Sequence, residues 1–329
     1  MKWNIKNILF LCCFTAGITS CENGDIEFDD FEYQTVYFSQ QTPIRTITLG
    51  DDVYDRTLDN EHCFEVYVTL GGVWKNRIDR VIGVVVDNSL CTNKKYADGT
   101  EVTPLPENYY QLGSNNITIP AGQIMGAVKV QLTDAFFADP KATSLHYVLP
   151  LRIVTSNDSI LEGKDYTLYA LNYKNKYHGC WISHGTDEIN TNGVITTVVR
   201  EAEYLEKNEL RYLTTLGLGV SSYAVETVVD ANDTKETLHC NLILTFDAND
   251  NCTITTTSEN CSVSGSGKWE RQGAKKAWGD KDRDQLTLNY TLTYNYTDKG
   301  QACYQTYKSN DILVMRDRES KFETFSMSE

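Results

Sequence analysis

The chain has 329 residues and carries 45 acidic against 30 basic side chains, which gives a formal net charge of −15. This acidic balance repels phosphate backbones and argues against a nucleic-acid-binding protein. At roughly 150 residues per domain, the length predicts two domains, each large enough to bury a core of its own.

The first thirty residues have the pattern of an export signal. Lys2 and Lys6 precede an apolar run over residues 8–14 that is too short to span a bilayer, and small residues then lead to Cys21. This pattern predicts a secretory signal peptide over residues 1–20. Its final cysteine resembles the lipobox of bacterial lipoproteins, which implies that Cys21 is lipidated and holds the protein at a membrane through acyl chains. The alternative is an ordinary secretory signal followed by a chance cysteine.

Carboxylates crowd residues 21–32, the segment that begins with Cys21. One interpretation is a solvated acidic tether. The other is a resemblance to the export signal that sends lipoproteins of Bacteroidetes-type bacteria to the outer face of the outer membrane. The second interpretation predicts a lipid-anchored protein of the outer membrane that faces the cell exterior.

Residues 33–173 contain short β-branched and alternating runs bounded by Gly, Asn and Asp. They recur at intervals of about ten residues, which is typical of antiparallel sandwiches and barrels. Pro150 lies inside one of these runs, and since proline cannot donate a ladder hydrogen bond it predicts an edge strand or a bulge. The expected strands lie at 33–38, 63–70, 80–86, 116–119, 126–132, 146–154 and 166–172.

A second β-rich part follows a polar step and covers residues 174–329. Its clearest hairpin has a turn at 247–251, because Asx residues accept the dihedral angles of tight turns. Residues 200–213 contain good helix formers but also Val and Tyr flanks, and we interpret them as a second β-hairpin. Further strands are expected at 238–246, 252–257, 285–296 and 312–316.

Seven cysteines follow Cys21. An oxidising exterior permits disulfides, but an odd count spread over two domains defines no framework. Cys252 and Cys261 would close a hairpin-sized loop if their strands pair. At least one thiol is expected to stay free.

The order of motifs resembles that of a family of surface lipoproteins. The N-terminal motifs are VYF at 36–38, PENYY at 106–110, ITIPAG at 117–122 and YVLPLRI at 147–153. The C-terminal motifs are YHGCW at 177–181, VSGSGKW at 263–269, WGDKDRD at 278–284, LTLNY at 286–290, LVMRDR at 313–318 and ETF at 323–325. The first set is similar to an uncharacterised β-sandwich domain of Bacteroidetes surface lipoproteins, and the second to the lipocalin-like module that often follows it.

This resemblance implies an all-β protein, with an Ig-like β-sandwich over residues 33–173 and a lipocalin-like antiparallel β-barrel over residues 174–329. Genes of the family are thought to sit in polysaccharide-utilisation loci. The resemblance therefore implies capture of an extracellular polysaccharide or oligosaccharide at the cell surface, beside an outer-membrane transporter and secreted hydrolases. That function is an association of the family and not a property that these residues demonstrate.

Sugar binding by a β domain needs a flat aromatic face for the ring and polar side chains for the hydroxyl groups. Trp269 follows a Gly-Ser-Gly segment interpreted as a turn, and Trp278 lies in a charged, glycine-flanked loop. Tyr294 and Tyr296 share one face of a strand by its two-residue period, and Trp74 lies at an expected hairpin tip. These five residues are the candidate glycan contacts. The competing interpretation is core packing, because large aromatic side chains are usually mostly buried.

Motifs for metal binding or catalysis are weak or missing in the sequence. His178, Cys180 and His184 are closely spaced, but a fourth zinc ligand is not apparent. The chain has no nucleophile elbow, phosphate-binding glycine loop or zinc-protease motif. We therefore expect no metal, no cofactor and no enzymatic activity.

The sequence as a whole predicts a non-catalytic cell-surface lipoprotein that binds an extracellular glycan within a polysaccharide uptake system. One alternative is a structural or adhesin-like surface protein whose partner is another protein. A further alternative is a hydrolase with an unrecognised site.

Overall fold

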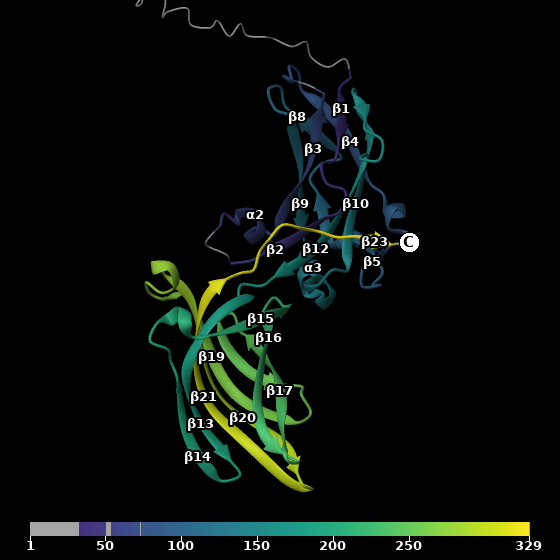
Figure 1. The fold of residues 1–329 in the computed structure, drawn as a ribbon. Helices are drawn as coiled ribbons and strands as arrows, with labels where there is room; N and C mark the ends of the chain where they lie inside the picture. Colours follow the sequence, from purple (N-terminus) through teal and green to yellow (C-terminus); the bar gives the residue numbers. More distant parts are fainter. Residues whose placement is uncertain (1–32, 51–53, 73, 329) are drawn as a thin grey trace, which may run out of the picture.

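The structure of the protein, a computed structural model, describes residues 33–50, 54–72 and 74–328. The predicted signal peptide, Cys21 and the acidic tether lie outside these residues. Strands dominate the described chain, which confirms the all-β prediction (Figure 1). Among the described residues, no helix is both long and apolar enough to cross a membrane. The helical segments are α2 (Thr57–Asn60), α3 (Asp134–Ala138), and the 3₁₀ helices η2 (Asn88–Cys91), η3 (Glu107–Tyr109), η4 (Pro140–Thr143), η5 (Leu205–Lys207) and η6 (Trp278–Asp280).

Two sheets form the N-terminal module, which we define by the strands β1 to β12. The first sheet has the order β11 (Ser159–Ile160), β1 (Thr35–Tyr37), β3 (Cys63–Gly71), β9 (Met125–Leu132) and β7 (Tyr110–Leu112). The second has the order β22 (Glu323–Thr324), β2 (Pro43–Thr48), β12 (Tyr166–Lys174), β10 (Tyr147–Thr155), β4 (Arg80–Val86) and β8 (Asn116–Ile119), with β6 (Thr103–Pro104) also paired to β10. A separate two-stranded sheet joins β5 (Lys95–Tyr96) to β23 (Met327–Ser328).

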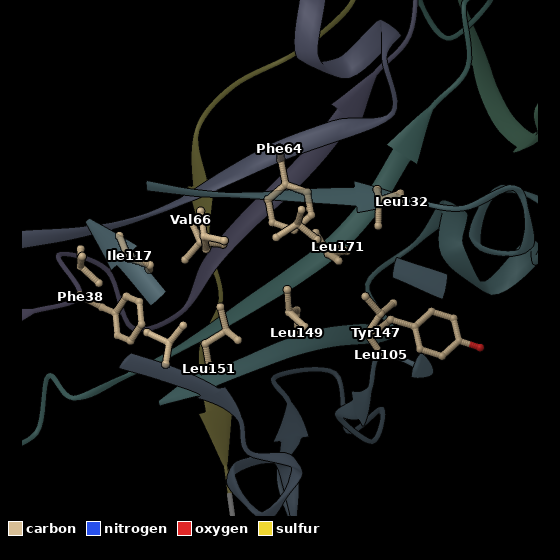
Figure 2. Packing of buried hydrophobic residues seen from close by; sticks show 14 of the residues in the cluster. Phe38, Phe64, Val66, Leu105, Ile117, Leu132, Tyr147, Leu149, Leu151 and Leu171 are labelled. Carbon is tan, nitrogen blue, oxygen red and sulfur yellow. The ribbon is translucent and has the colours of Figure 1, made fainter. Parts of the chain in front are cut away.

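The two larger sheets pack face to face around one apolar core. Figure 2 shows Phe64 and Val66 of β3 facing Leu149 and Leu151 of β10, with Leu171 of β12 between them. The residues are brought together by the two-residue period of a strand, which places every second side chain on the same face. β9 follows this rule, because every second residue along it is buried.

Strand β10 is buried on both faces, and its sequence therefore reads as a continuous apolar run. Leu149 and Leu151 enter the main core, whereas Val148 joins a smaller cluster with Cys91 and Tyr96 on the other face.

The prediction that Pro150 lies in an edge strand is wrong. β10 lies inside its sheet, with β12 on one side and both β4 and β6 on the other. The Pro150 carbonyl accepts a hydrogen bond from the Asp87 N–H at 3.1 Å, and the nitrogen of a strand residue faces the same side as its carbonyl. On that side of β10, Pro150 lies between the end of β4 and the end of β6. No strand residue there needs a hydrogen bond from the nitrogen of Pro150. The register shift in this strand lies further on, between Ile153 and Thr155.

Nine strands from β13 to β21 form one sheet that closes on itself, and we call it the closed sheet. Its strands are β13 (Gly179–Thr191), β14 (Val194–Arg200), β15 (Glu209–Gly217), β16 (Val220–Ala231), β17 (Thr234–Phe246), β18 (Asn251–Thr256), β19 (Cys261–Ala274), β20 (Arg283–Asp298) and β21 (Gln301–Asp317). Neighbours in sequence pair from β15 through to β21, and β21 then pairs with β13. A second apolar core, separate from that of the N-terminal module, fills this sheet.

The hairpin with its turn at 247–251 is confirmed, since β17 pairs with β18 from Leu242 to Phe246. The interpretation of residues 200–213 as a hairpin is wrong. β14 and β15 do not pair with each other, because both pair with the same edge of β13: β15 over residues 179–183 and β14 over residues 185–191. In the described chain, the outer edge of β14 and the matching edge of β16 beyond Tyr223 therefore have no strand partner.

The end of the chain returns to the N-terminal module, although the predicted second domain extends to residue 329. β22 pairs with β2, and β23 pairs with β5. Phe325 enters the smaller apolar cluster beside Tyr96. In Figure 1 this segment is the yellow strand that runs from the closed sheet back along the N-terminal module.

All seven cysteines after Cys21 are free thiols, which confirms that at least one stays free. β18 and β19 do pair, but Cys252 lies opposite Gly267 and Cys261 lies opposite Tyr294. The register therefore keeps Cys252 and Cys261 from forming the bridge that their spacing allowed.

Candidate functional site

A cavity of about 270 Å³ lies inside the closed sheet, near the unpaired edges of β14 and β16. Its volume lies just below the range of small-molecule sites, which enclose roughly 300–1,000 Å³. Four tyrosines and two arginines line it together with acidic and apolar side chains. The lining includes Asp187, Val198, Arg200, Arg211, Tyr223, Glu226, Tyr290, Tyr294, Tyr307, Ser309 and Asp311.

Arg200 joins two buried carboxylates on the wall of this cavity. Its Nε donates to Asp187 Oδ2 at 2.6 Å, its Nη2 donates to Asp187 Oδ1 at 3.2 Å, and Nη2 also pairs with Asp311. Ser309 Oγ donates a further hydrogen bond to Asp187 at 2.7 Å. Burial alone would lower the pKa of Arg200, but its bonds and charge interactions with both carboxylates raise the pKa above its ordinary value. Arg200 therefore stays charged and offsets one of the two negative charges of Asp187 and Asp311.

Two tyrosines complete the hydrogen bonds of Asp311. Tyr290 donates to Asp311 Oδ2 at 2.9 Å, and Tyr223 donates to the same oxygen at 3.4 Å. Burial, followed by the negative charge of Asp311, raises the pKa of both phenols. Both hydroxyls therefore remain protonated donors that are already occupied by protein.

Tyr307 and Tyr294 form an aromatic pair elsewhere on the wall. Their rings meet edge to face, with centroids 6.1 Å apart. The Tyr307 hydroxyl is bound to Thr227 Oγ1 at 2.6 Å. Within the described chain the Tyr294 hydroxyl has no such hydrogen bond, and burial raises its pKa.

Arg211 of β15 also reaches the cavity. Its Nη2 pairs with Glu209 at 2.8 Å, whereas its Nε is buried and has no hydrogen-bond partner among the described residues. Leaving a buried donor unsatisfied costs about 1–3 kcal/mol, so such groups are rare in folded proteins. Arg211 is therefore the polar group of this wall that most clearly lacks an acceptor.

This arrangement is suited to binding a small polar molecule. The tyrosine rings offer apolar faces, and the remaining polar groups can fix orientation. Asp187 and Asp311 are both held by Arg200, so neither carboxylate is left over as a separate acid or base in the cavity.

Of the five predicted glycan contacts, Tyr294 is the one that lines this cavity. Trp269 is only 7% exposed and packs edge to face against Tyr177, with the Lys176 ammonium 4.5 Å from its ring centroid. Its ring belongs to the core of the closed sheet, as the competing interpretation held.

The expectation of a turn before Trp269 is wrong, because residues 263–269 lie within the continuous strand β19. A Cβ added at Gly265 would come within 2.5 Å of the Asn289 carbonyl oxygen, and one at Gly267 within 2.6 Å of the Thr287 carbonyl oxygen. The two glycines therefore permit close approach of β19 to β20.

The other three predicted contacts lie outside the cavity. Trp278 is half-buried on η6, with the Arg316 guanidinium carbon 5.6 Å from its ring centroid. Tyr296 is half-buried, and its hydroxyl accepts a hydrogen bond from Asn192 at 3.4 Å. Trp74 is 64% exposed and belongs to the N-terminal module. The structure does not gather these residues into one aromatic platform.

The spacing of His178, Cys180 and His184 does not produce a metal centre in the described chain, where no group of three or more His, Cys, Asp or Glu side chains is arranged to hold an ion. His178 Nδ1 instead accepts a hydrogen bond from the Thr215 N–H at 3.2 Å.

Sequence reasoning did not identify Arg200, Asp187, Asp311 or Arg211 as site residues. They lie on four different strands, and the ion pair between Arg200 and Asp311 spans 111 positions of sequence. The sequence of β20 could have indicated part of this site. Tyr290 and Tyr294 are four positions apart on a strand, so their side chains lie on the same face.

Two family models match the chain. Residues 176–319 match the family described as a domain of unknown function, DUF5627, and residues 31–160 match a model described as an N-terminal domain. The crystal structure of a protein of unknown function from Bacteroides ovatus is similar to this chain. The two sequences are 34% identical, and the structures have a TM-score of 0.82 over 91% of this chain and 99% of that chain. No curated protein matches significantly.

More distant structures share far less. A multidomain protein including DUF1735 from Bacteroides ovatus is 14% identical, with a TM-score of 0.46 over 89% of this chain and all of that chain. An auxiliary nutrient binding protein from Bacteroides thetaiotaomicron is 14% identical, with a TM-score of 0.41 over 76% of this chain and 83% of that chain. Similarity this low does not support a shared function.

Proposed function

Because this chain belongs to the same family as the Bacteroides ovatus protein of unknown function, and the part that matches DUF5627, residues 176–319, carries a tyrosine-lined cavity, we propose that it is a non-catalytic saccharide-binding lipoprotein of the cell surface. In this proposal it captures an extracellular glycan for a polysaccharide uptake system. The closed sheet acts as a lipocalin-like barrel, and the N-terminal module acts as an Ig-like sandwich that carries it.

The cavity is the observation that carries this proposal. Saccharides are bound by aromatic faces that cover the apolar side of the ring and by polar groups that meet its hydroxyls. Tyr294 and Tyr307 supply such faces, and Arg211 and the Tyr294 hydroxyl supply polar groups that the protein leaves unoccupied. The volume of about 270 Å³ suits a single sugar unit or the end of a chain.

A binding role without catalysis fits the chemistry of the wall. Glycoside hydrolysis needs two carboxyl groups about 5–9 Å apart with different tasks, one of them protonated. Here both buried carboxylates share the same guanidinium, that of Arg200, and both accept further hydrogen bonds from neighbouring hydroxyls.

The cavity can be tested with two neighbouring residues of the edge strand β14. Val198 lines the cavity and is 41% exposed, whereas Val199 does not line it and is 65% exposed. Val198→Trp would fill the cavity from its open side without disturbing a packed core, and Val199→Trp is the matched control. In affinity electrophoresis on a panel of polysaccharides, we expect the wild type and Val199→Trp to be retarded and Val198→Trp to lose retardation.

Three results would contradict the proposed saccharide binding or its non-catalytic character. If the wild type is retarded by no polysaccharide and binds no oligosaccharide by calorimetry, the proposal fails. If Val198→Trp is retarded as strongly as the wild type, saccharides bind elsewhere. Release of reducing sugar from a retained polysaccharide would contradict a non-catalytic role.

The surface location needs its own experiment. We expect metabolic labelling with a fatty-acid probe to mark the wild-type protein and to leave Cys21→Ala unmarked. Protease treatment of intact cells would then remove the labelled protein if it faces the exterior. An unlabelled wild type recovered in the soluble fraction would overturn this part of the proposal.

One observation favours the second candidate, an adhesin-like protein with a protein partner. β14 is an edge strand whose outer backbone groups have no strand partner in the described chain, and Val194, Ile195 and Val199 are exposed along it. Such edges accept an added strand from another chain. This candidate gains support if the saccharide panel is negative and Ile195→Lys abolishes attachment of expressing cells to a protein-coated surface.

A further inference from the structure

The polar groups of the cavity divide into those already paired and those left open. Asp187 and Asp311 are bound by Arg200, Ser309 and Tyr290. A ligand could reach this cluster only by breaking bonds that hold β13, β14, β20 and β21 together. Recognition must therefore come from the groups that remain open.

Arg211 is the charged group that remains open. One Nη of its guanidinium is paired with Glu209, but its Nε is buried and lacks an acceptor among the described residues. The neighbouring donor on that edge, Nη2, is held by Glu209, so a ligand oxygen would accept from Nε–H alone. A charge-assisted hydrogen bond to a carboxylate oxygen is stronger there than a bond to a neutral hydroxyl oxygen. An acceptor supplied by the ligand would satisfy this buried donor.

Tyr294 supplies a second open group beside Arg211. Its hydroxyl has no hydrogen-bond partner in the described chain, and burial raises its pKa further above neutral pH, so it remains a donor. Arg211, Tyr223 and Tyr294 line the same cavity. Arg211 Nε and the Tyr294 hydroxyl are thus open donors, whereas the lining carboxylate of Glu226 lies 3.2 Å from His239 Nδ1.

The charges around the cavity favour an anion only beside Arg211. Arg200 offsets one of the two negative charges of Asp187 and Asp311. The lining as a whole has three carboxylates, those of Asp187, Glu226 and Asp311, against the guanidiniums of Arg200 and Arg211. The unoccupied positive donor is therefore local to Arg211 Nε. Glu209 pairs with Arg211 and Glu226 lies on the lining, and their side chains are 51% and 60% exposed. Water screens exposed charges strongly, so their repulsion of a bound anion is weak.

We propose that the cavity selects saccharides that carry a carboxylate, the uronic acids, and that Arg211 is the residue that determines this selectivity. The inference rests on the proposed saccharide-binding function and names its ligand class. In the complex, the ligand carboxylate accepts from Arg211 Nε and the Tyr294 hydroxyl donates to a second oxygen of the sugar.

The test compares matched sugars by isothermal titration calorimetry with the mature chain. D-Glucuronate and D-galacturonate are the acidic probes, and D-glucose and D-galactose are their neutral counterparts. We expect each acid to bind at least about tenfold more tightly than its neutral counterpart, a factor that one charge-assisted hydrogen bond supplies. Added salt should weaken binding of the acids and leave that of the neutral sugars unchanged.

Three variants assign the preference to one residue. Arg211→Gln should lose the preference for acids, because the affinity for each acid falls more than the affinity for its neutral counterpart. Arg211→Lys should restore part of the preference because the charge returns. Arg316→Gln, which alters an arginine outside the cavity over Trp278, should behave as the wild type. Far-ultraviolet circular dichroism and a thermal melt of each variant verify that it is folded.

The outcomes separate the two proposals. If neutral sugars bind as tightly as the acids, or if Arg211→Gln keeps the preference, this inference is overturned while saccharide binding stands. If neither these four sugars nor any polysaccharide of the panel binds the folded wild type, saccharide binding itself fails and this inference falls with it.

Discussion

Arg200 on β14 and Asp311 on β21 form an ion pair across Gly185, the residue of β13 that lies opposite both of them. The ion pair joins the edge strand β14 to β21 by crossing β13, the strand that lies between them. β14 has β13 as its strand partner in the described chain, so this ion pair is a second attachment. The shape of the cavity therefore depends on Gly185, because this glycine has no side chain between Arg200 and Asp311.

Replacing Gly185 should destabilise the closed sheet. A Cβ at this position would come within 2.0 Å of the Asn310 carbonyl oxygen, which belongs to the backbone of β21. We expect Gly185→Ala to lower the free energy of unfolding by about 1–3 kcal/mol, as overpacking usually does, measured by urea denaturation. Gly217→Ala is the control, since an added Cβ there meets only ordinary contacts at 3.7 Å or more. Equal midpoints for the two variants would contradict the expectation.

The two tryptophans of the C-terminal motifs should respond differently to truncation. Trp269 is buried in the core, so we expect Trp269→Ala to lower the free energy of unfolding by about 3–5 kcal/mol. Trp278 is half-buried outside the cavity. Trp278→Ala should therefore cost less stability and leave the retardation by polysaccharides unchanged in affinity electrophoresis. Loss of retardation in a Trp278→Ala variant of normal stability would instead place a glycan contact on η6.

His178 should make stability depend on acidity. Burial, followed by the positive charges of Lys174 and Arg318, lowers the pKa of His178 from 6.5 to about 3. The folded protein therefore keeps a neutral imidazole between pH 6.5 and pH 3, while the unfolded chain takes up a proton. The stability that this group contributes is complete above pH 6.5 and is lost progressively as the pH falls through this window.

The corresponding variant is His178→Gln, whose amide oxygen can still accept from the Thr215 N–H. Urea denaturation at several pH values between 7 and 5 should show a shallower loss of stability for His178→Gln than for the wild type. His239→Gln, which changes an exposed histidine on β17, should follow the wild type. Parallel curves for His178→Gln and the wild type would exclude His178 as a source of this dependence.

Arg318 should stabilise the junction between the closed sheet and the N-terminal module. Its guanidinium donates to the buried Asp284 at 2.8 Å, to the His178 carbonyl at 3.2 Å and to the Gly50 carbonyl at 3.5 Å. Removing one partner from a buried ion pair costs about 3–5 kcal/mol. We expect Arg318→Ala to lose stability on this scale in thermal unfolding. Lys235→Ala, which breaks an exposed pair with Asp230, should leave the melting temperature unchanged.

The strands were predictable where one physical signal decided the outcome. Alternating apolar residues defined β9, and the Asx residues at 247–251 defined the turn between β17 and β18. The two-residue period also placed Tyr294 on a definite face of β20, which proved to line the cavity. In each case a few adjacent residues carry the whole signal.

Pairing between strands was not predictable in this way. Residues 200–213 were interpreted as a hairpin because β14 and β15 are neighbours in sequence, yet both pair with β13. Gly265 and Gly267 were interpreted as a turn, although they allow β20 to approach β19 closely. A glycine read from sequence alone does not distinguish these two uses.

The cavity residues were hidden for the same reason. Asp187, Arg200 and Asp311 become neighbours only through the register of β13 with β14 and β21. Charged residues on a strand are ordinarily expected to face solvent, and nothing local shows that these three compensate one another inside the closed sheet.

The return of the chain to the N-terminal module has a mechanical consequence. The chain leaves that module near Lys174 and comes back at Glu319, and Lys174 Nζ donates to the Glu319 carbonyl at 2.9 Å. A tension applied between β1 and β23 would pass through the N-terminal module and across this short bridge. The closed sheet would not bear this tension, because its two ends are joined by the contact between Lys174 and Glu319. The cavity would therefore keep its shape while the N-terminal module is stretched.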